Sequence, residues 1–422
     1  MTPSEENTTS RSSRGQRIAN LVSWRIAIMA FLGGIGGGVV FPILPALGQR
    51  MGLSAFMIGV ILAANRIARL GVNPLTGALT DRYGGRGVIA TGLFIEGFGT
   101  LGYIAALHFA LPAAWFLAGR LIWGVGSSLL FVGAIAAVLT LSESRDRGRF
   151  VARARSAVSL GVPGGLVLGG IVADLVSADA AFGVAMALSI AAGFAALAGI
   201  PPRAPHTRRR MREARPQGTR DWLQLLRQRR LAGIWLYAAL ISFAVQGLLL
   251  ATLVLLVEQR NTFIADFGAE GSAGLLMAIL MLAYAGTSVA IGRRLDLLGR
   301  RTVLIVPTVV ILIAGFALLA WAPSLAWVLV ALIVTGVGTG AAIIPILTLL
   351  GDLVPPERRG RATAIYQVAA DAGGTLGPIL GLVLGVRFGF LFLYGGLALL
   401  FVLSLPLALA LVRAERSASG PE

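Results

Sequence analysis

Five ionisable residues lie inside otherwise apolar stretches of the sequence, and they are the strongest candidates for chemistry. Arg66 and Arg69 share one stretch, whereas Glu96, Arg120 and Asp371 each occupy another. A charge at the centre of a membrane costs at least about 2.5–3.5 kcal/mol on insertion scales, so it is usually kept for function. We therefore expect these residues to mark a pathway for substrate and protons.

The spacing of these residues suggests which of them lie near one another. Arg66, Arg69 and Asn73 recur at helical spacing, which places them in one polar stripe. At a rise of about 1.5 Å per residue, Arg69 and Glu96 lie roughly 18 and 15 Å deep in consecutive stretches. This geometry permits an ion pair between Glu96 and Arg69.

Asp371 belongs to a distant stretch and has Gln367 one helical turn before it. Two interpretations of the buried charges stay open. In the first, they form ion pairs that only hold helices together. In the second, Asp371 or Glu96 exchanges a proton while the arginines attract substrate. Burial and a neighbouring cation have opposite effects on a carboxylate, so one group can change its protonation with conformation.

The composition requires a membrane for this chain. Of its 422 residues, 56% are hydrophobic and 13% charged, whereas about a quarter of a typical soluble chain is charged. One helical crossing needs about 20 apolar residues, and lipid favours helices over open strands. We predict an all-α membrane protein with twelve transmembrane helices, at 25–47, 56–79, 88–109, 113–140, 153–175, 179–200, 231–257, 271–291, 302–322, 325–350, 362–386 and 388–411.

The net charge of +17 comes from arginine alone, because the chain contains no lysine. If the N-terminus is cytoplasmic, 30 of the 36 arginines lie in cytoplasmic segments. Only Arg50, Arg260 and Arg387 lie in external loops. This bias predicts an inner-membrane protein with both termini in the cytoplasm. The basicity is thus an orientation signal, and we expect no nucleic-acid partner.

The sequence divides into two halves that repeat one another. Matching motifs recur at offsets of 215 and 212 residues, which predicts two six-helix bundles related by pseudo-two-fold symmetry. A hydrophilic, arginine-rich segment separates the halves and reads as a linker. The predicted divisions are a cytoplasmic N-terminal segment 1–24, a first bundle 25–200, a linker 201–230, a second bundle 231–411 and a tail 412–422.

A glycine- and charge-rich motif follows the second stretch and is repeated after the eighth. The first copy contains Gly77, Asp81, Arg82, Gly84 and Arg86, and the second contains Gly292, Asp296, Gly299, Arg300 and Arg301. The glycines permit close helix approach and a tight turn. The aspartate can pair with cations or cap a neighbouring helix. We expect a gate that closes the cytoplasmic side in one state; a static turn is the alternative.

Two glycine ladders with four-residue spacing also recur. They contain Gly161, Gly165 and Gly169 in the first half and Gly373, Gly377, Pro378 and Gly381 in the second. Glycines at this spacing share one helix face, so two backbones can approach closely. We predict that both ladders are helix-packing surfaces.

Over residues 25–411 the chain resembles the major facilitator superfamily. The resemblance rests on the segment from Gly77 to Arg86, on its second copy, and on Arg120 followed by Gly124-Val-Gly126. It implies two six-helix bundles around a central cavity that opens alternately to each side. In this family the arginine at the position of Arg120 is tied to proton coupling, although Trp123 departs from the usual pattern here.

We expect a secondary active transporter that moves small organic molecules by alternating access, as an antiporter that couples efflux to protons. Proton-coupled uptake of an organic anion is an alternative suggested by Arg66 and Arg69, and a non-transporting receptor on the same scaffold is another. We expect no enzyme and no metal or cofactor, since the chain has only two histidines and lacks the lysine of a Walker A loop. The expected partners are a small-molecule substrate, protons and the lipid bilayer, and the expected state is a monomer.

Overall fold

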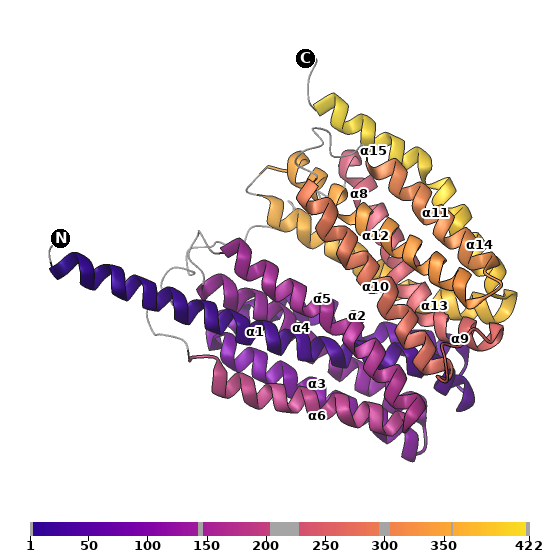
Figure 1. The fold of residues 1–422 in the computed structure, drawn as a ribbon, viewed down its shortest axis with the longest axis horizontal. Helices are drawn as coiled ribbons and strands as arrows, with labels where there is room; N and C mark the ends of the chain where they lie inside the picture. The colour runs from indigo at the N-terminus through magenta and orange to yellow at the C-terminus, as the bar shows by residue number, and fades with distance from the viewer. Residues whose placement is uncertain (1–2, 142–146, 203–227, 295–303, 356–357, 419–422) are drawn as a thin grey trace. The chain divides into compact units, whose positions relative to one another are not determined.

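The computed structural model describes residues 3–141, 147–202, 228–294, 304–355 and 358–418, which are almost entirely helical (Figure 1). The elements are α1 (Pro3–Arg50), α2 (Ala55–Tyr83), α3 (Gly85–His108), α4 (Pro112–Leu141), α5 (Arg147–Leu175), α6 (Ala178–Gly199), α8 (Arg229–Ile241), the π-helix η2 (Ser242–Leu249), α9 (Leu250–Arg260), α10 (Ala269–Arg294), α11 (Ile305–Trp321), α12 (Leu325–Leu353), α13 (Arg359–Phe388), α14 (Phe390–Leu403) and α15 (Leu405–Ala418).

The described residues of the twelve apolar runs are almost entirely helical. Eleven helical stretches within the described residues are long and apolar enough to cross a membrane, and α11 is a shorter apolar helix. The elements α8, η2 and α9 together form one of these stretches, Leu231–Arg260, and α14 continues into α15 to form another, Phe390–Val412. The prediction of an all-α, many-span protein is confirmed.

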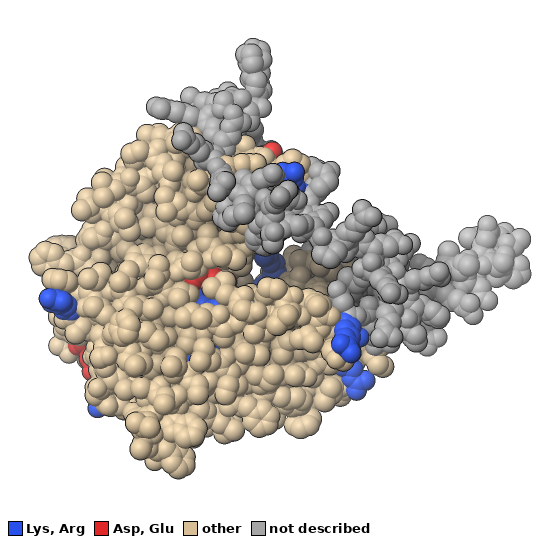
Figure 2. Space-filling model, turned by 180° about the vertical axis from the view of Figure 1, so that it is seen from behind, with Lys and Arg blue, Asp and Glu red and all other residues tan. Residues whose placement is uncertain are grey.

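The surface of these helices suits a hydrocarbon environment. Large apolar side chains such as Phe98, Phe194 and Phe392 are more than half exposed. In Figure 2 most of the visible surface is tan, and the blue and red side chains occupy little of it. Apolar groups exposed on this scale would be a liability in water and are expected against lipid.

Glycines bring α3 and α4 into close contact along much of their length. A Cβ atom on Gly99 would lie 2.7 Å from the backbone nitrogen of Trp123, and one on Gly102 would lie 2.7 Å from the Cα atom of Gly119. Neither position has room for a side chain. Small residues at such crossings let the helix backbones touch, and they bury the neighbouring side chains of both helices.

The glycine ladders lie where backbones cross. Members of the α13 ladder face the backbone of α8 and η2, and members of the α5 ladder face backbone carbonyls of α1. These glycines are Gly373, Gly377 and Gly381 on α13, and Gly161 and Gly165 on α5. Gly169 is also buried. Their positions agree with a packing role.

Contacts divide the chain into two compact units that differ from its sequence halves. Unit 1 contains Met1–Val40, Ile67–Gly165 and Asp179–Arg215, and unit 2 contains Phe41–Arg66, Leu166–Ala178 and Pro216–Glu422. Segments of α1, α2 and α5 thus pack with the C-terminal helices. The division into bundles 25–200 and 231–411 stays a prediction about the repeat, and most of the linker 201–230 lies outside the described residues.

Candidate functional site

Five polar or aromatic side chains meet in the interior of unit 1, and we call them the buried cluster. Glu96 of α3 and Arg120 of α4 have 0% exposure. Tyr103, two turns after Glu96, lies within electrostatic reach of both charges. The guanidinium carbon of Arg120 lies 5.7 Å from the ring centroid of Trp123. Ser189 of α6, which is 1% exposed, completes the cluster.

The first helix makes room for this cluster by presenting glycines to it. A Cβ atom on Gly33 would lie 2.9 Å from Oε2 of Glu96. A Cβ atom on Gly36 would lie 3.4 Å from both Nε1 of Trp123 and Oγ of Ser189. The cluster is therefore enclosed by α1, α3, α4 and α6, and α1 contributes no side chain at these two positions.

The carboxyl group of Glu96 has no polar protein partner within the described part of the chain. Neither Oε1 nor Oε2 forms a hydrogen bond there. The ion pair with Arg69 that the spacing permits is therefore not formed in the described structure. Leaving a buried polar group unpaired costs about 1–3 kcal/mol, and more for a charge. Such a cost needs a reason beyond packing.

The repeat supplies an internal comparison for this site. Gly126 packs against Glu96, and a Cβ atom there would lie 2.9 Å from Cγ of Glu96. In the second half Gly338 makes the corresponding contact with Ile311, at 3.0 Å from Cγ2. Leu332, the counterpart of Arg120, is also fully buried. The same glycine contact therefore forms around an apolar residue in the other copy.

Arg66 of α2 binds backbone carbonyls in unit 2. Its Nη1 donates to the carbonyl oxygen of Gly374, and its Nη2 donates to that of Gln246 at 3.1 Å. Pro378, four residues after Gly374, has no N–H group, so α13 cannot satisfy that carbonyl by itself. Gln246 lies in the π-helical segment η2, where the α-helical bonding pattern is interrupted. Arg66 thus satisfies carbonyls at two irregular points.

Asp371 lies one turn before Gly374 on α13 and is 5% exposed. Its carbonyl oxygen accepts a hydrogen bond from Oγ1 of Thr375 at 2.7 Å. Gln367, one turn earlier, is exposed. Arg66 therefore reaches α13 one turn after Asp371.

The remaining members of the polar stripe have other surroundings. Asn73 accepts a hydrogen bond at Oδ1 from the hydroxyl of Ser128 on α4, at 2.6 Å. Arg69 is half-buried. Asn73 and Ser128 belong to unit 1, whereas Arg66 belongs to unit 2. That Arg66 and Asn73 contribute to one pathway therefore stays a prediction.

The first copy of the charged motif forms the turn between α2 and α3. Gly84 has φ of 80°, a conformation that favours glycine. Arg82 is exposed, and its guanidinium carbon lies 5.2 Å from the ring centroid of Tyr83. Close helix approach at Gly77 is wrong for the described residues, since a Cβ atom there would meet none of their atoms within 4 Å. The backbone conformation thus explains Gly84 but not Gly77.

The structure describes only some of the other residues of the two motif copies. Arg86 is half-buried near the start of α3. The side chain of Asp81 lies outside the described residues, as do the second-copy residues Asp296, Gly299, Arg300 and Arg301. Gly292, near the end of α10, likewise has no described atom within 4 Å of a Cβ placed on it. The gating role of these residues stays a prediction.

Two polar contacts in unit 2 fasten α1 and α5 to the start of α10, and we call them the α10 latch. Arg50, the last residue of α1, forms an ion pair with Glu270. Asp174, near the end of α5, accepts a hydrogen bond from the backbone N–H of Gly271 at 2.7 Å. The first N–H groups of a helix lack intrahelical partners, so Asp174 caps α10. Sequence analysis missed the latch.

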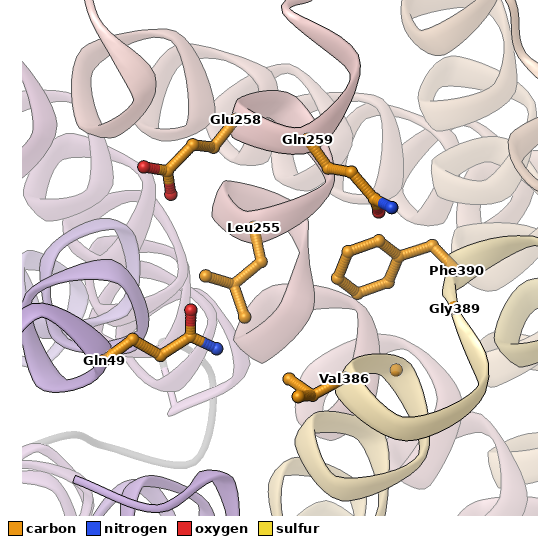
Figure 3. A pocket seen from close by; sticks show the side chains of 8 residues that line it. Gln49, Leu255, Glu258, Gln259, Val386, Gly389 and Phe390 are labelled. Atoms are coloured by element: carbon orange, nitrogen blue, oxygen red, sulfur yellow. The ribbon is translucent and has the colours of Figure 1, made fainter. Parts of the chain in front are cut away.

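A cavity of about 320 Å³ opens near the ends of α1, α9 and α13 (Figure 3). Its lining includes Leu255, Phe390, Gln49, Glu258 and Gln259. None of the predicted pathway residues lines it. We therefore do not assign the substrate site to this cavity.

Tyr103 and Ser189 were also missed by sequence analysis, because neutral side chains in apolar runs carry little signal. The glycine-rich segment of α1, with Gly33 and Gly36, was the available clue. Five glycines within six residues make a helix face with little side-chain volume, which suits a neighbour that needs space.

The comparisons with known proteins agree with this architecture. A family model described as Major Facilitator Superfamily matches residues 26–263 and again 261–422. The chain is 23% identical over 350 residues to the bacillibactin exporter of Bacillus subtilis, covering 82% of this chain and 85% of the relative. It is 31% identical over 160 residues to the multidrug resistance protein MdtH of an Enterobacter species, covering 37% and 38%.

A solved structure resembles the fold over nearly the whole chain. It is a bacterial homologue of the human lysosomal transporter Spinster in an inward-facing and unoccupied conformation, with a TM-score of 0.77. The sequences are 14% identical, and the match covers 95% of this chain and 98% of the other. This likeness supports the fold alone.

Proposed function

Since the chain belongs to the major facilitator superfamily of transporters, we propose that it exports small organic molecules in exchange for protons. Its relatives are transporters rather than enzymes. The names of two similar proteins, an exporter and a multidrug resistance protein, favour efflux. The excess of arginine in alternate loops supports placement in the inner membrane with both termini cytoplasmic. We further propose that the working unit is a monomer.

The observation that carries the proposal is the unmatched charge in the buried cluster. Glu96 and Arg120 are fully buried, and their counterparts in the other half are Ile311 and Leu332. The glycine contact around Glu96 recurs around Ile311. Helix packing therefore does not demand a carboxylate here. A group that is costly to bury and not needed for packing is a candidate for the transport reaction.

The proton would bind at the carboxyl group of Glu96. An ionised carboxylate is strongly disfavoured in a dry interior, and neutralisation by a proton removes most of that cost. Arg120 favours the charged form when it is near, so a small movement of α4 relative to α3 changes the balance between the two forms. Opening and closing of the transporter would thereby be coupled to uptake and release of a proton.

The other predicted pathway residues have supporting roles in this proposal. Asp371 is the second buried carboxyl group and the alternative proton carrier. Arg66 keeps α2 bound to α13 beside it through the carbonyl of Gly374. Arg69 and Gln367 are the remaining polar groups that we propose for substrate contact, and Asn73 fixes α2 against Ser128 of α4.

Alternating access requires contacts that form on one side and break when that side opens. The α10 latch supplies such contacts, because it consists of one ion pair and one capping hydrogen bond. We propose that it closes the external side, and that the motif around Gly84 and Asp81 closes the cytoplasmic side.

Transport into proteoliposomes under an imposed pH gradient tests this function. Dyes, sugars and organic acids would be screened, and the proposal requires that movement of at least one compound reverses when the gradient is reversed. Glu96→Gln, which cannot ionise, should retain exchange of substrate for substrate and lose the response to the gradient. A chain that binds compounds without counterflow would instead be a receptor.

Uptake of an organic anion is the second candidate, and Arg69 is the residue that favours it. Arg69→Ala would then abolish binding of carboxylate or phosphate compounds and leave binding of neutral compounds unchanged. Arg66 is less suited to this role, because backbone carbonyls already occupy its Nη1 and Nη2 groups.

A further inference from the structure

An arginine of α5 is held in a fixed orientation by α1 at one end of unit 1. Nη1 of Arg153 donates to Oδ1 of Asn20 at 2.9 Å, to Oγ of Ser23 at 2.5 Å and to the carbonyl of Asn20 at 3.4 Å. The guanidinium carbon lies 4.1 Å from the ring centroid of Trp24. Hydrogen bonds on one edge and an aromatic ring below fix the guanidinium plane.

The remaining edge of this guanidinium is available for a ligand. All three hydrogen bonds use Nη1, and Nε and Nη2 of Arg153 donate to no residue in the described parts of the chain. Nε and Nη2 present two parallel N–H groups, which match two oxygens of a phosphate. Among the described residues, the hydrogen-bond, ring and electrostatic partners of Arg153 are Asn20, Ser23, Trp24, Phe150 and Arg149, and none is acidic.

A second positive charge stands beside the first. Arg149, one turn earlier on α5, donates from Nη2 to the same Oδ1 of Asn20 at 3.4 Å and lies within electrostatic reach of Arg153. Two guanidinium groups that converge on one neutral oxygen repel each other. An anion bound to Nε and Nη2 of Arg153 would offset this repulsion.

An apolar surface adjoins the two arginines. Trp24 is 52% exposed, and Leu21 and Ile28, which share its helix face, are 52% and 50% exposed. Tryptophan is enriched at the level of lipid headgroups. This end of α1 therefore offers a contact for a charged headgroup beside a contact for an acyl chain. A free phosphate ion could use only the first of these contacts.

We propose that this surface binds an anionic phospholipid. The phosphate lies on Nε and Nη2 of Arg153 and next to Arg149, and an acyl chain covers Trp24 and Ile28. Basic pockets between transmembrane helices recognise anionic headgroups in this way. A zwitterionic lipid has no net negative charge to attract the guanidinium group of Arg153 and binds more weakly. The proposal requires only that the chain resides in a membrane, so it stands or falls independently of the transported substrate.

Lipid titration of the purified full chain in detergent, followed by native mass spectrometry, tests the site. Phosphatidylglycerol should bind the variant Arg149→Gln/Arg153→Gln about thirtyfold more weakly than wild type, the factor expected for two interfacial arginines. Arg155→Gln is the matched control, because Arg155 is an exposed arginine on the same helix. Its affinity for phosphatidylglycerol should equal that of wild type.

Three results would overturn the proposal: unchanged binding in the double variant, an equal loss in Arg155→Gln, or equal affinity for phosphatidylcholine. Glycerol phosphate and inorganic phosphate distinguish a lipid site from an anion site, and competition by either at lipid concentrations would contradict the lipid assignment. If the double variant does not fold, brominated phosphatidylglycerol is added to wild type and to Trp24→Phe. Quenching should be smaller in Trp24→Phe, and equal quenching of the remaining tryptophans would refute the site.

Discussion

Replacing the two charges of the buried cluster with their apolar counterparts separates a structural role from a transport role. The variant Glu96→Ile/Arg120→Leu carries the residue types found at Ile311 and Leu332. Burying a charge without a compensating partner is costly, so replacing both charges by apolar residues of similar volume should leave the free energy of unfolding near the wild-type value or raise it. Arg120→Leu alone keeps the cost of burying Glu96, so it should be less stable than the double variant.

The expected result is a folded protein that has lost proton-driven transport. Thermal unfolding in detergent, followed by tryptophan fluorescence, measures stability, and pH-driven uptake into proteoliposomes measures coupling. Thr100→Val is the matched control, because its buried hydroxyl donates only to the carbonyl of Glu96 in its own helix. It should unfold near the wild-type temperature and transport normally.

Two outcomes would refute this reasoning. If the double variant unfolds well below wild type, the charges hold the helices together and the comparison with Ile311 is misleading. If the double variant folds and still accumulates substrate in response to a pH gradient, neither Glu96 nor Arg120 couples protons to transport.

Three further predictions test other parts of the structure. If Asp371 carries the proton in place of Glu96, Asp371→Asn should abolish pH-driven accumulation, and unchanged coupling would remove Asp371 from the proton role. Gly374→Ala should lower the unfolding temperature, because the added Cβ would lie 2.9 Å from Cζ of Arg66. Arg66→Met should itself lose about 2 kcal/mol of stability, because two interhelical hydrogen bonds disappear. In that background Gly374→Ala should cause no further loss. Glu270→Gln combined with Asp174→Asn should weaken the α10 latch. A single cysteine introduced at the cavity of Figure 3 should then be labelled about threefold to fivefold faster, and the native chain contains no cysteine that interferes. An unchanged labelling rate would contradict the latch.

The helices could be predicted from sequence because a bilayer imposes one rule on every span. A run of about 20 apolar residues needs an internally bonded backbone, so each of the twelve runs becomes a helix whatever its neighbours are. The depth of the charges in the membrane follows from the same rule and stays a prediction. Glu96, Arg120 and Asp371 are buried within the protein.

The partners of the charges could not be predicted, because they depend on contacts between distant segments. The guanidinium of Arg66 satisfies the carbonyl of Gly374, which lies 308 residues away. Pro378, four residues after Gly374, lacks the N–H group that would normally bond that carbonyl within the helix. Helical spacing grouped Arg66 with Asn73, but it cannot show that the two ends of one long helix pack against different neighbours.

The glycines also show what spacing in the sequence can and cannot predict. The spacing of Gly373 and Gly377 indicated a packing face, and both contact a neighbouring backbone. Gly77 was predicted to do so as well, yet no described atom approaches it. Four-residue spacing places several glycines on one face of a helix. A single glycine in a motif does not indicate whether helix packing or the backbone conformation requires it.

Arg66 and Glu96 differ in whether a structural contact accounts for their charge. Arg66 has a structural reason, since it donates to backbone carbonyls of α13 and η2. Glu96 has none among its described neighbours, because its oxygens accept no hydrogen bond and its counterpart Ile311 packs against the corresponding glycine. A costly group that the fold does without in one copy must be kept in the other for a different reason. A carboxyl group in a dry interior can exchange a proton, and that exchange is the chemistry by which a gradient could drive this transporter.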